Sequence, residues 1–79
     1  MSWNHRVLVT MHKDEPYFAV HEVHYDENGK PVAYTKEPVR ISADDIDGIE
    51  WQLDRIEQCL MNTKLWAGDR FPEEYREKP

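Results

Sequence analysis

The segment at positions 45–60, DIDGIEWQLDRIEQCL, constrains the fold most, because its apolar residues recur at spacings of three and four. This periodicity is typical of an amphipathic helix that buries one face. Ser42 predicts the start of the helix, since a hydroxyl N-cap followed by acidic residues stabilises a helix N-terminus. Gly68 predicts its end. We call the predicted buried face the apolar stripe; it consists of Ile46, Ile49, Leu53, Ile56 and Leu60.

Three segments before this helix have the composition of β-strands. Positions 6–12, RVLVTMH, alternate between two faces, and positions 17–25, YFAVHEVHY, are rich in aromatic and β-branched residues. A third strand is predicted at positions 32–35. Asn28 and Gly29 predict the hairpin that precedes it, because both central residues of a type I′ turn need a positive φ angle.

Together these elements predict an α+β fold, namely a three-stranded antiparallel β-meander followed by one long amphipathic helix packed on a sheet face. Residues 1–68 form the single predicted domain, and residues 69–79 form a polar C-terminal tail. The chain has 79 residues, and a domain of this size buries only roughly 60% of the surface that its unfolded chain exposes. We therefore expect a thin core.

The single cysteine, Cys59, excludes an intramolecular disulfide and is typical of a reducing compartment. The first fifteen residues contain neither a long apolar stretch nor a small-residue cleavage site. No segment approaches the roughly 20 apolar residues that span a membrane. We therefore expect a soluble protein located in the cytoplasm.

The formal net charge of −6 is concentrated in positions 42–62, which contain six acidic residues and a single base, Arg55. A chain of this charge lacks the cationic surface with which proteins bind bare nucleic acid. It complements a basic protein surface instead. The composition therefore favours a basic protein partner over nucleic acid or a membrane.

Four of these acids lie beside the apolar stripe when the segment is drawn as a helix with 3.6 residues per turn. Like charges at these spacings destabilise a helix by roughly 0.2–0.5 kcal/mol per pair, and Arg55 alone offsets them. Two interpretations remain open, a solvated helix face and a surface that binds a protein partner. We call this set the acidic stripe; it consists of Asp47, Glu50, Asp54 and Glu57.

Trp51 lies on the side of the predicted helix opposite the apolar stripe, so a sheet that covers the stripe leaves Trp51 at least partly exposed. Tryptophan is enriched at the energetic centres of protein interfaces, which favours a role as a binding anchor. The alternative is that the C-terminal tail folds back over Trp51, with Phe71 or Tyr75 as the cover.

Neither a metal site nor a catalytic site is predicted. His21 and His24 are three residues apart on a predicted strand, where side chains alternate between faces, so these two cannot bind one ion. Cys59 lies in the C-terminal half of the helix, where the helix dipole has the wrong sign to stabilise a thiolate. The three glycines form no phosphate-binding loop. The sequence predicts a protein that is not an enzyme and needs no cofactor.

The segments SWNHRVLV (2–9), YFAVHEVHYDENGKP (17–31) and EPV (37–39) resemble a family of small bacterial and phage proteins. These proteins share a Trp-Asn-x-Arg-Val opening, a His-Glu-Val-x-Tyr-Asp strand and a Gly-Lys-Pro turn, followed by an acidic helix. The resemblance covers about the first half of the chain and implies a sheet followed by a helix. In size and acidity the chain is also similar to phage anti-CRISPR proteins, which implies binding to nucleic-acid-binding surfaces of host complexes.

The sequence thus predicts a non-enzymatic acidic protein that binds a basic surface of a nucleic-acid-binding complex, as a phage-type inhibitor and nucleic-acid mimic. One alternative is a structural homodimer formed through the apolar stripe, whose spacing is that of a coiled-coil seam. Another is an enzyme that uses Cys59 with a histidine. The predicted partner-binding residues are Asp47, Glu50, Trp51, Asp54 and Glu57.

Overall fold

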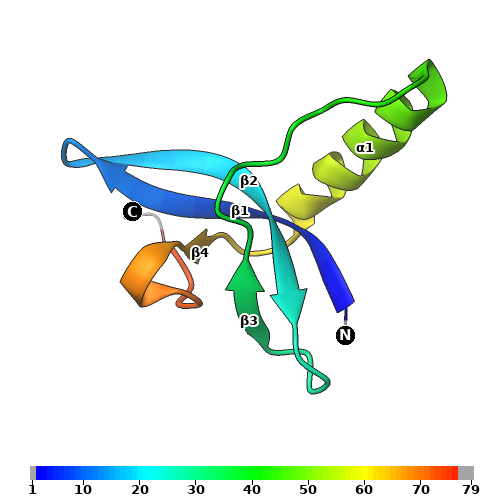
Figure 1. Ribbon diagram of the computed structural model, residues 1–79. Coiled ribbons are helices and arrows are strands. Elements are labelled where there is room, and N and C mark those ends of the chain that lie inside the picture. Colours follow the sequence, from blue (N-terminus) through cyan, green and yellow to red (C-terminus); the bar gives the residue numbers. More distant parts are fainter. Residues whose placement is uncertain (1, 77–79) are drawn as a thin grey trace.

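The computed structural model describes residues 2–76 and contains one four-stranded sheet in the order β3-β2-β1-β4 (Figure 1). Strands β1 (Ser2–His12) and β2 (Glu15–Tyr25) form a long antiparallel hairpin, and β3 (Pro31–Tyr34) pairs antiparallel with the end of β2. The short strand β4 (Leu65–Trp66) pairs parallel with the middle of β1. The sheet is therefore mixed, and it is strongly twisted and curled.

The prediction of a three-stranded antiparallel meander is wrong, because the chain returns to the sheet after the helix and adds β4. The sequence pattern placed Leu65 and Trp66 at the end of the helix. In the structure Leu65 is 5% exposed, and it packs with Leu8 and Val23 in the main core cluster. The backbone N–H of Ala67 donates to the carbonyl of Val9 at 2.9 Å. Burial of Leu65 and pairing with β1 together explain why this segment is a strand.

The predicted type I′ turn is found in the β1–β2 hairpin and not at Asn28-Gly29. The β1–β2 hairpin closes at Lys13 and Asp14, whose φ angles of 51° and 68° are those of a two-residue type I′ turn. The loop at Gly29 is longer, and among its residues only this glycine has a positive φ, 79°. The Oδ1 atom of Asp26 organises that loop by accepting hydrogen bonds from the backbone N–H groups of Asn28 and Lys30, each at 2.9 Å.

Strand β1 buries residues on both of its faces. Val7 and Val9 lie on one face and Leu8 on the other, and none of the three is more than 8% exposed. The Leu8 face carries the main core cluster. The partly buried hydrophobic side chains that pack against this cluster are Tyr25, Tyr34, Ala67 and Phe71.

Helix α1 (Ile46–Gln58) begins later than predicted, with Asp45 in place of Ser42 as its N-cap. The Oδ1 atom of Asp45 accepts a hydrogen bond from the backbone N–H of Gly48 at 2.8 Å. The backbone of Ser42 instead bonds to the side-chain amide of Gln52, as donor at 3.0 Å and as acceptor at 2.6 Å. These bonds hold the connecting segment against the helix.

The helix also ends earlier than predicted, in a single 3₁₀ turn, η1 (Cys59–Met61). Directly after it, the Nη2 atom of Arg6 donates to the carbonyl oxygen and to Oγ1 of Thr63, both at 2.7 Å. These bonds attach the chain to β1 and direct it toward β4, which explains why the helix does not continue to Gly68.

The predicted packing of the helix across a sheet face is wrong as well. Helix α1 projects from the sheet and approaches β1 only near its C-terminal end (Figure 1). No residue of α1 is buried, and the next residue, Cys59, is 3% exposed. The half-buried face is rotated away from the apolar stripe and includes two polar residues; it consists of Gly48, Ile49, Gln52, Arg55 and Ile56.

The segment after β4 folds back along the sheet edge through the 3₁₀ turn η2 (Gly68–Arg70) and a β-bridge between Leu65 and Glu74. The predicted division into a domain of residues 1–68 and a tail of residues 69–79 stays a prediction, and residues 77–79 lie outside the described part. Within residues 2–76, no helix has the length and apolar character needed to cross a membrane.

Candidate partner-binding surface

The structure places all four residues of the acidic stripe on the exposed side of α1. At 3.6 residues per turn, the middle of this stripe lies about 180° around the helix axis from the half-buried face. Helix α1 projects from the sheet (Figure 1), and all four side chains of the acidic stripe are exposed. The acidic stripe is therefore presented to solvent along the whole helix.

Trp51 is 54% exposed, and it does have an intramolecular partner. The guanidinium carbon of Arg55 lies 4.9 Å from the ring centroid of Trp51 and 5.2 Å from that of Trp3. A cation over an aromatic face is stabilised by the ring quadrupole, by roughly 0.5–2 kcal/mol. Arg55 therefore connects α1 to the first residues of β1 through two indole rings.

The described part of the C-terminal segment lies away from Trp51. The ring of Tyr75 contacts those of Phe18 and Trp66, with centroids 5.7 and 5.1 Å apart. Phe71 packs on Tyr34, at 4.8 Å between centroids. Both proposed covers for Trp51 thus pack against other rings, and the alternative in which the tail covers this tryptophan is not seen in residues 2–76.

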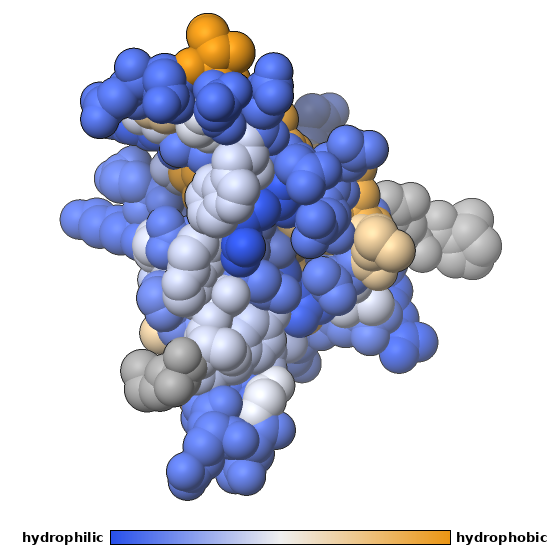
Figure 2. All heavy atoms as spheres, turned by 90° about the vertical axis from the view of Figure 1, so that its right-hand side faces the viewer, coloured by the Kyte–Doolittle hydropathy of each residue, from blue (hydrophilic) through white to orange (hydrophobic). Residues whose placement is uncertain are grey.

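Part of the apolar stripe is also exposed, because the sheet does not cover it. Ile46 and Leu60 are each 71% exposed and Leu53 is 48% exposed. These three residues follow one another at intervals of seven, so they form one line along the helix. We call them the outer apolar line. It runs directly beside the acidic stripe. Figure 2 shows the side from which α1 projects, where hydrophilic residues predominate and hydrophobic ones are interspersed.

A hollow of about 370 Å³ lies where α1 passes into η1. Its lining combines two acids of the acidic stripe with the end of the outer apolar line and with Met61, which is 87% exposed. We call this hollow the α1 groove; it is lined by Asp54, Glu57, Gln58, Leu60 and Met61.

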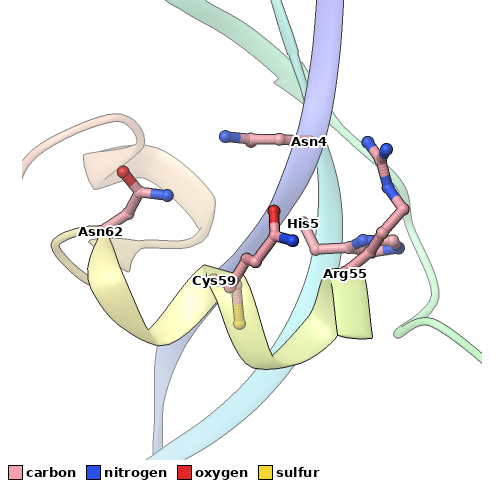
Figure 3. Close-up of a pocket in the computed structure, with 6 residues that line it drawn as sticks. Asn4, His5, Arg55, Cys59 and Asn62 are labelled. Carbon is pink, nitrogen blue, oxygen red and sulfur yellow. The ribbon is translucent and has the colours of Figure 1, made fainter. Parts of the chain in front are cut away.

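A separate polar pocket of about 70 Å³ lies between the start of β1 and the end of α1 (Figure 3). This volume is well below the roughly 300–1,000 Å³ of pockets that bind small organic molecules. The Nδ1 atom of His5 and the Nε atom of Arg55 are buried, and neither has a hydrogen-bond partner among residues 2–76. The lining residues are Asn4, His5, Arg55, Gln58, Cys59 and Asn62.

This pocket brings Cys59 and His5 into one place, which bears on the alternative of a cysteine enzyme. In Figure 3 the imidazole of His5 lies toward Arg55, whereas the sulfur of Cys59 points in another direction. Burial raises the pKa of the Cys59 thiol, so the reactive thiolate is disfavoured. Burial also lowers the pKa of His5; Glu22 opposes this shift and Arg55 adds to it. The arrangement favours two neutral, structural side chains over a nucleophile and its base.

The other histidines lie apart from one another. His21 is buried, with Nδ1 2.8 Å from the carbonyl oxygen of Thr35. His24 lies on the opposite face of β2, and its Nε2 atom is 3.9 Å from Oε1 of Glu22. Within the described residues, no group of three or more His, Cys, Asp and Glu side chains is arranged to hold a metal ion.

Sequence reasoning missed three parts of this surface: the stacked Arg55, its second ring Trp3, and Met61 in the lining of the α1 groove. The stacking of Arg55 on Trp51 has a sequence signal, because the two residues are four apart on the predicted helix and thus neighbours. The contribution of Trp3 has none, since it depends on where the helix end meets β1.

Comparisons of this chain with protein-family models, with curated proteins and with solved structures found no match.

Proposed function

We propose that the protein is a non-enzymatic, acidic protein-binding module that occupies a basic nucleic-acid-binding surface of a host complex, as a phage-type inhibitor of the anti-CRISPR kind. The observation that carries the proposal is the position of the acidic stripe. Its four carboxylates line the exposed side of a helix that projects from the sheet. Binding to a cytoplasmic complex would place the protein in the cytoplasm of the host cell.

The spacing of the charges supports a partner that normally binds a polyanion. From Asp47 to Glu57 the stripe is about 15 Å long at ~1.5 Å per residue, which is one carboxylate per ~5 Å. A DNA strand carries one phosphate per ~3.4 Å. The stripe is sparser but of the same sign and similar shape, so a cationic groove that tracks a phosphate backbone would also attract α1.

The exposed part of the apolar stripe favours a second candidate, a structural homodimer. Ile46, Leu53 and Leu60 are exposed at the seven-residue spacing of a coiled-coil seam. On the helix, however, Glu57 and Glu50 lie only about 20° and 40° from Ile46. Pairing two copies along this line would bring acidic residues of both copies together, which opposes self-association and favours a basic partner.

The proposal is tested by immobilising the protein and passing a nuclease-treated bacterial lysate over it. We expect retention of basic nucleic-acid-binding proteins that are released by duplex DNA or RNA and by raised salt, because screening weakens exposed charge pairs. The Glu50→Lys/Asp54→Lys variant is expected to retain at least roughly tenfold less of them.

The matched control, Glu27→Lys/Glu37→Lys, changes the net charge equally at exposed positions outside α1. It should retain nearly as much as the wild-type protein. Equal retention by the α1 variant and the wild-type protein would contradict the proposal, as would retained proteins that nucleic acid does not displace.

A further inference from the structure

The α1 groove combines features that the rest of the acidic stripe lacks. Asp54 and Glu57 are neighbours on the helix at the i,i+3 spacing, so their carboxylates border the same hollow. Leu60 and Met61 add apolar surface to the lining, and both are more than two-thirds exposed. The remaining acids of the stripe lie along the helix before this groove.

This combination matches the chemistry of one kind of side chain. Arginine and lysine have a long aliphatic stem that favours an apolar surface and a cationic end that favours carboxylates. The planar guanidinium of arginine also donates paired hydrogen bonds to carboxylates. Gln58 adds a neutral amide to the groove lining. An acidic side chain would be repelled by the carboxylates, and a purely apolar one would leave them without a cationic partner.

We infer that the α1 groove seats an arginine or lysine side chain of a basic protein partner and is the anchor point of the interface. This inference rests on the proposed function and makes it more specific, because it distinguishes an anchored interface from attraction by net charge alone. The partner surface is thereby expected to present a cationic residue beside an apolar one, since the outer apolar line leads directly into the groove.

A second copy of the chain is the competing occupant of this surface. The segment at positions 42–62 carries six acids and one base, so two copies facing each other through α1 would repel. Sedimentation velocity at two protein concentrations distinguishes the two occupants. We expect a monomer at both; a dimer that is lost in the Leu60→Ser/Met61→Ser variant would overturn the inference.

The direct test uses a defined probe, a fluorescein-labelled amphipathic helical peptide with arginines beside a leucine line, and the same peptide with citrulline in place of arginine. Citrulline keeps the shape and removes the charge. We expect the arginine peptide to bind at least roughly tenfold tighter than the citrulline peptide, by fluorescence anisotropy at about 0.15 M salt. Its binding should shift backbone amide resonances of residues 54–61.

Two variants separate the parts of the groove. Asp54→Asn/Glu57→Gln should weaken binding of the arginine peptide roughly five- to tenfold, whereas the charge-matched control Glu27→Gln/Glu37→Gln should weaken it less than roughly twofold. Leu60→Ser/Met61→Ser leaves every charge in place and should also weaken binding roughly tenfold. The exposure of Leu60 and Met61 means that the fold should tolerate this change, which thermal unfolding verifies.

The outcomes distinguish failure of this inference from failure of the proposed function. If Leu60→Ser/Met61→Ser binds the peptide as the wild-type protein does, while Glu50→Lys/Asp54→Lys abolishes binding, the groove is not an anchor and the charge-based function stands. If reversal of Glu50 and Asp54 changes neither peptide binding nor retention of host proteins, the proposed function itself fails.

Discussion

Strand β1 and helix α1 have similar lengths, 11 and 13 residues, but they are buried to very different degrees. β1 lies inside the sheet between β2 and β4, and its central residues are buried on both faces. α1 has no buried residue and meets the sheet near its end. Although its sequence has the regular apolar spacing of a core helix, much of that apolar surface remains exposed.

This difference separates the residues that hold the fold from those available for binding. The core is formed by residues of β1, β2 and β4, so most of the outer surface of α1 can change without loss of packing. A helix that projects from a domain leaves apolar side chains in contact with water, which is unfavourable. An exposed apolar line beside an acidic stripe is typical of a surface that another molecule covers.

The largest effect is expected in the core around β1. Replacing Leu8, which is 2% exposed, by alanine should lower the free energy of unfolding by about 2–5 kcal/mol, because it leaves a cavity in the main core cluster. The control is Leu53→Ala on α1, 48% exposed, for which we expect a change within about 0.5 kcal/mol. Urea unfolding measures both; similar losses would contradict the division.

The start of α1 is the next most sensitive point. A Cβ atom at Gly48 would lie 2.6 Å from Cβ of Ala43 and 3.1 Å from the capping oxygen of Asp45. Alanine normally stabilises a helix relative to glycine by roughly 1 kcal/mol, but here we expect Gly48→Ala to destabilise by about 1–2 kcal/mol. The double variant Gly48→Ala/Ala43→Gly should regain most of the lost stability, which thermal unfolding measures. Stabilisation by Gly48→Ala alone would exclude this close approach.

Replacement of Arg55 tests the connection between helix and sheet. Arg55→Ala removes both cation–π contacts and should cost about 1–2 kcal/mol of unfolding free energy. It should also change the fluorescence of Trp3 and Trp51. Arg70, which lies 4.3 Å over Trp66 but is 58% exposed, is the matched control. Arg70→Ala should leave the helix content and stability nearly unchanged, and an equal loss would argue against a special role of Arg55.

The pH dependence of stability reports the two buried neutral groups. Because the pKa of His5 is lowered in the folded protein, its unfolded form binds more protons, so stability should fall as pH decreases below the ordinary histidine pKa of about 6.5. The pKa of Cys59 is raised from 9.0, so stability should fall as pH rises above that value. Thermal unfolding at a series of pH values measures both effects. The His5→Gln variant should lose the acid decrease in stability, and the Cys59→Ser variant should lose the alkaline one. A decrease that persists in its variant would belong to another group.

The smallest effect is expected in the acidic stripe, and its sign is opposite. Glu50→Gln/Asp54→Asn relieves like-charge pairs at i,i+3 and i,i+4 spacings, each destabilising by roughly 0.2–0.5 kcal/mol. We therefore expect a slight gain in the free energy of unfolding together with weaker partner binding. Chemical unfolding and peptide anisotropy measure the two quantities. A loss of stability would show that these acids serve the fold.

The sequence located much of the local structure, with particular exceptions. The segments predicted as strands at positions 6–12 and 17–25 lie within β1 and β2, and the apolar spacing at positions 46–58 corresponds to α1. The prediction placed helix ends at Ser42 and Gly68 because both residue types suit those positions. It could not weigh them against Asp45, which caps the observed helix, or against the sheet pairing that captures Leu65.

The candidate surface was predicted in part. Exposure of the acidic stripe and of Trp51 agrees with the helical positions read from the sequence, but their role in binding stays a prediction. The apolar stripe was expected to be buried in full. The half-buried face instead centres on Gln52 and keeps only Ile49 and Ile56 of the apolar stripe, because the hydrogen bonds of Gln52 to Ser42 and the stacking of Arg55 on Trp3 orient the helix.

By itself the sequence determined where β1, β2, β3 and α1 form and where the negative charge gathers, because periodicity and charge order are properties of neighbouring residues. The tertiary structure alone decided that β4 joins β1 in parallel, that α1 projects from the sheet, and that the α1 groove forms at its end. These features depend on contacts between residues distant in the chain, such as Arg6 with Thr63 and Leu8 with Leu65. The spacing of neighbouring residues contains no information about such contacts.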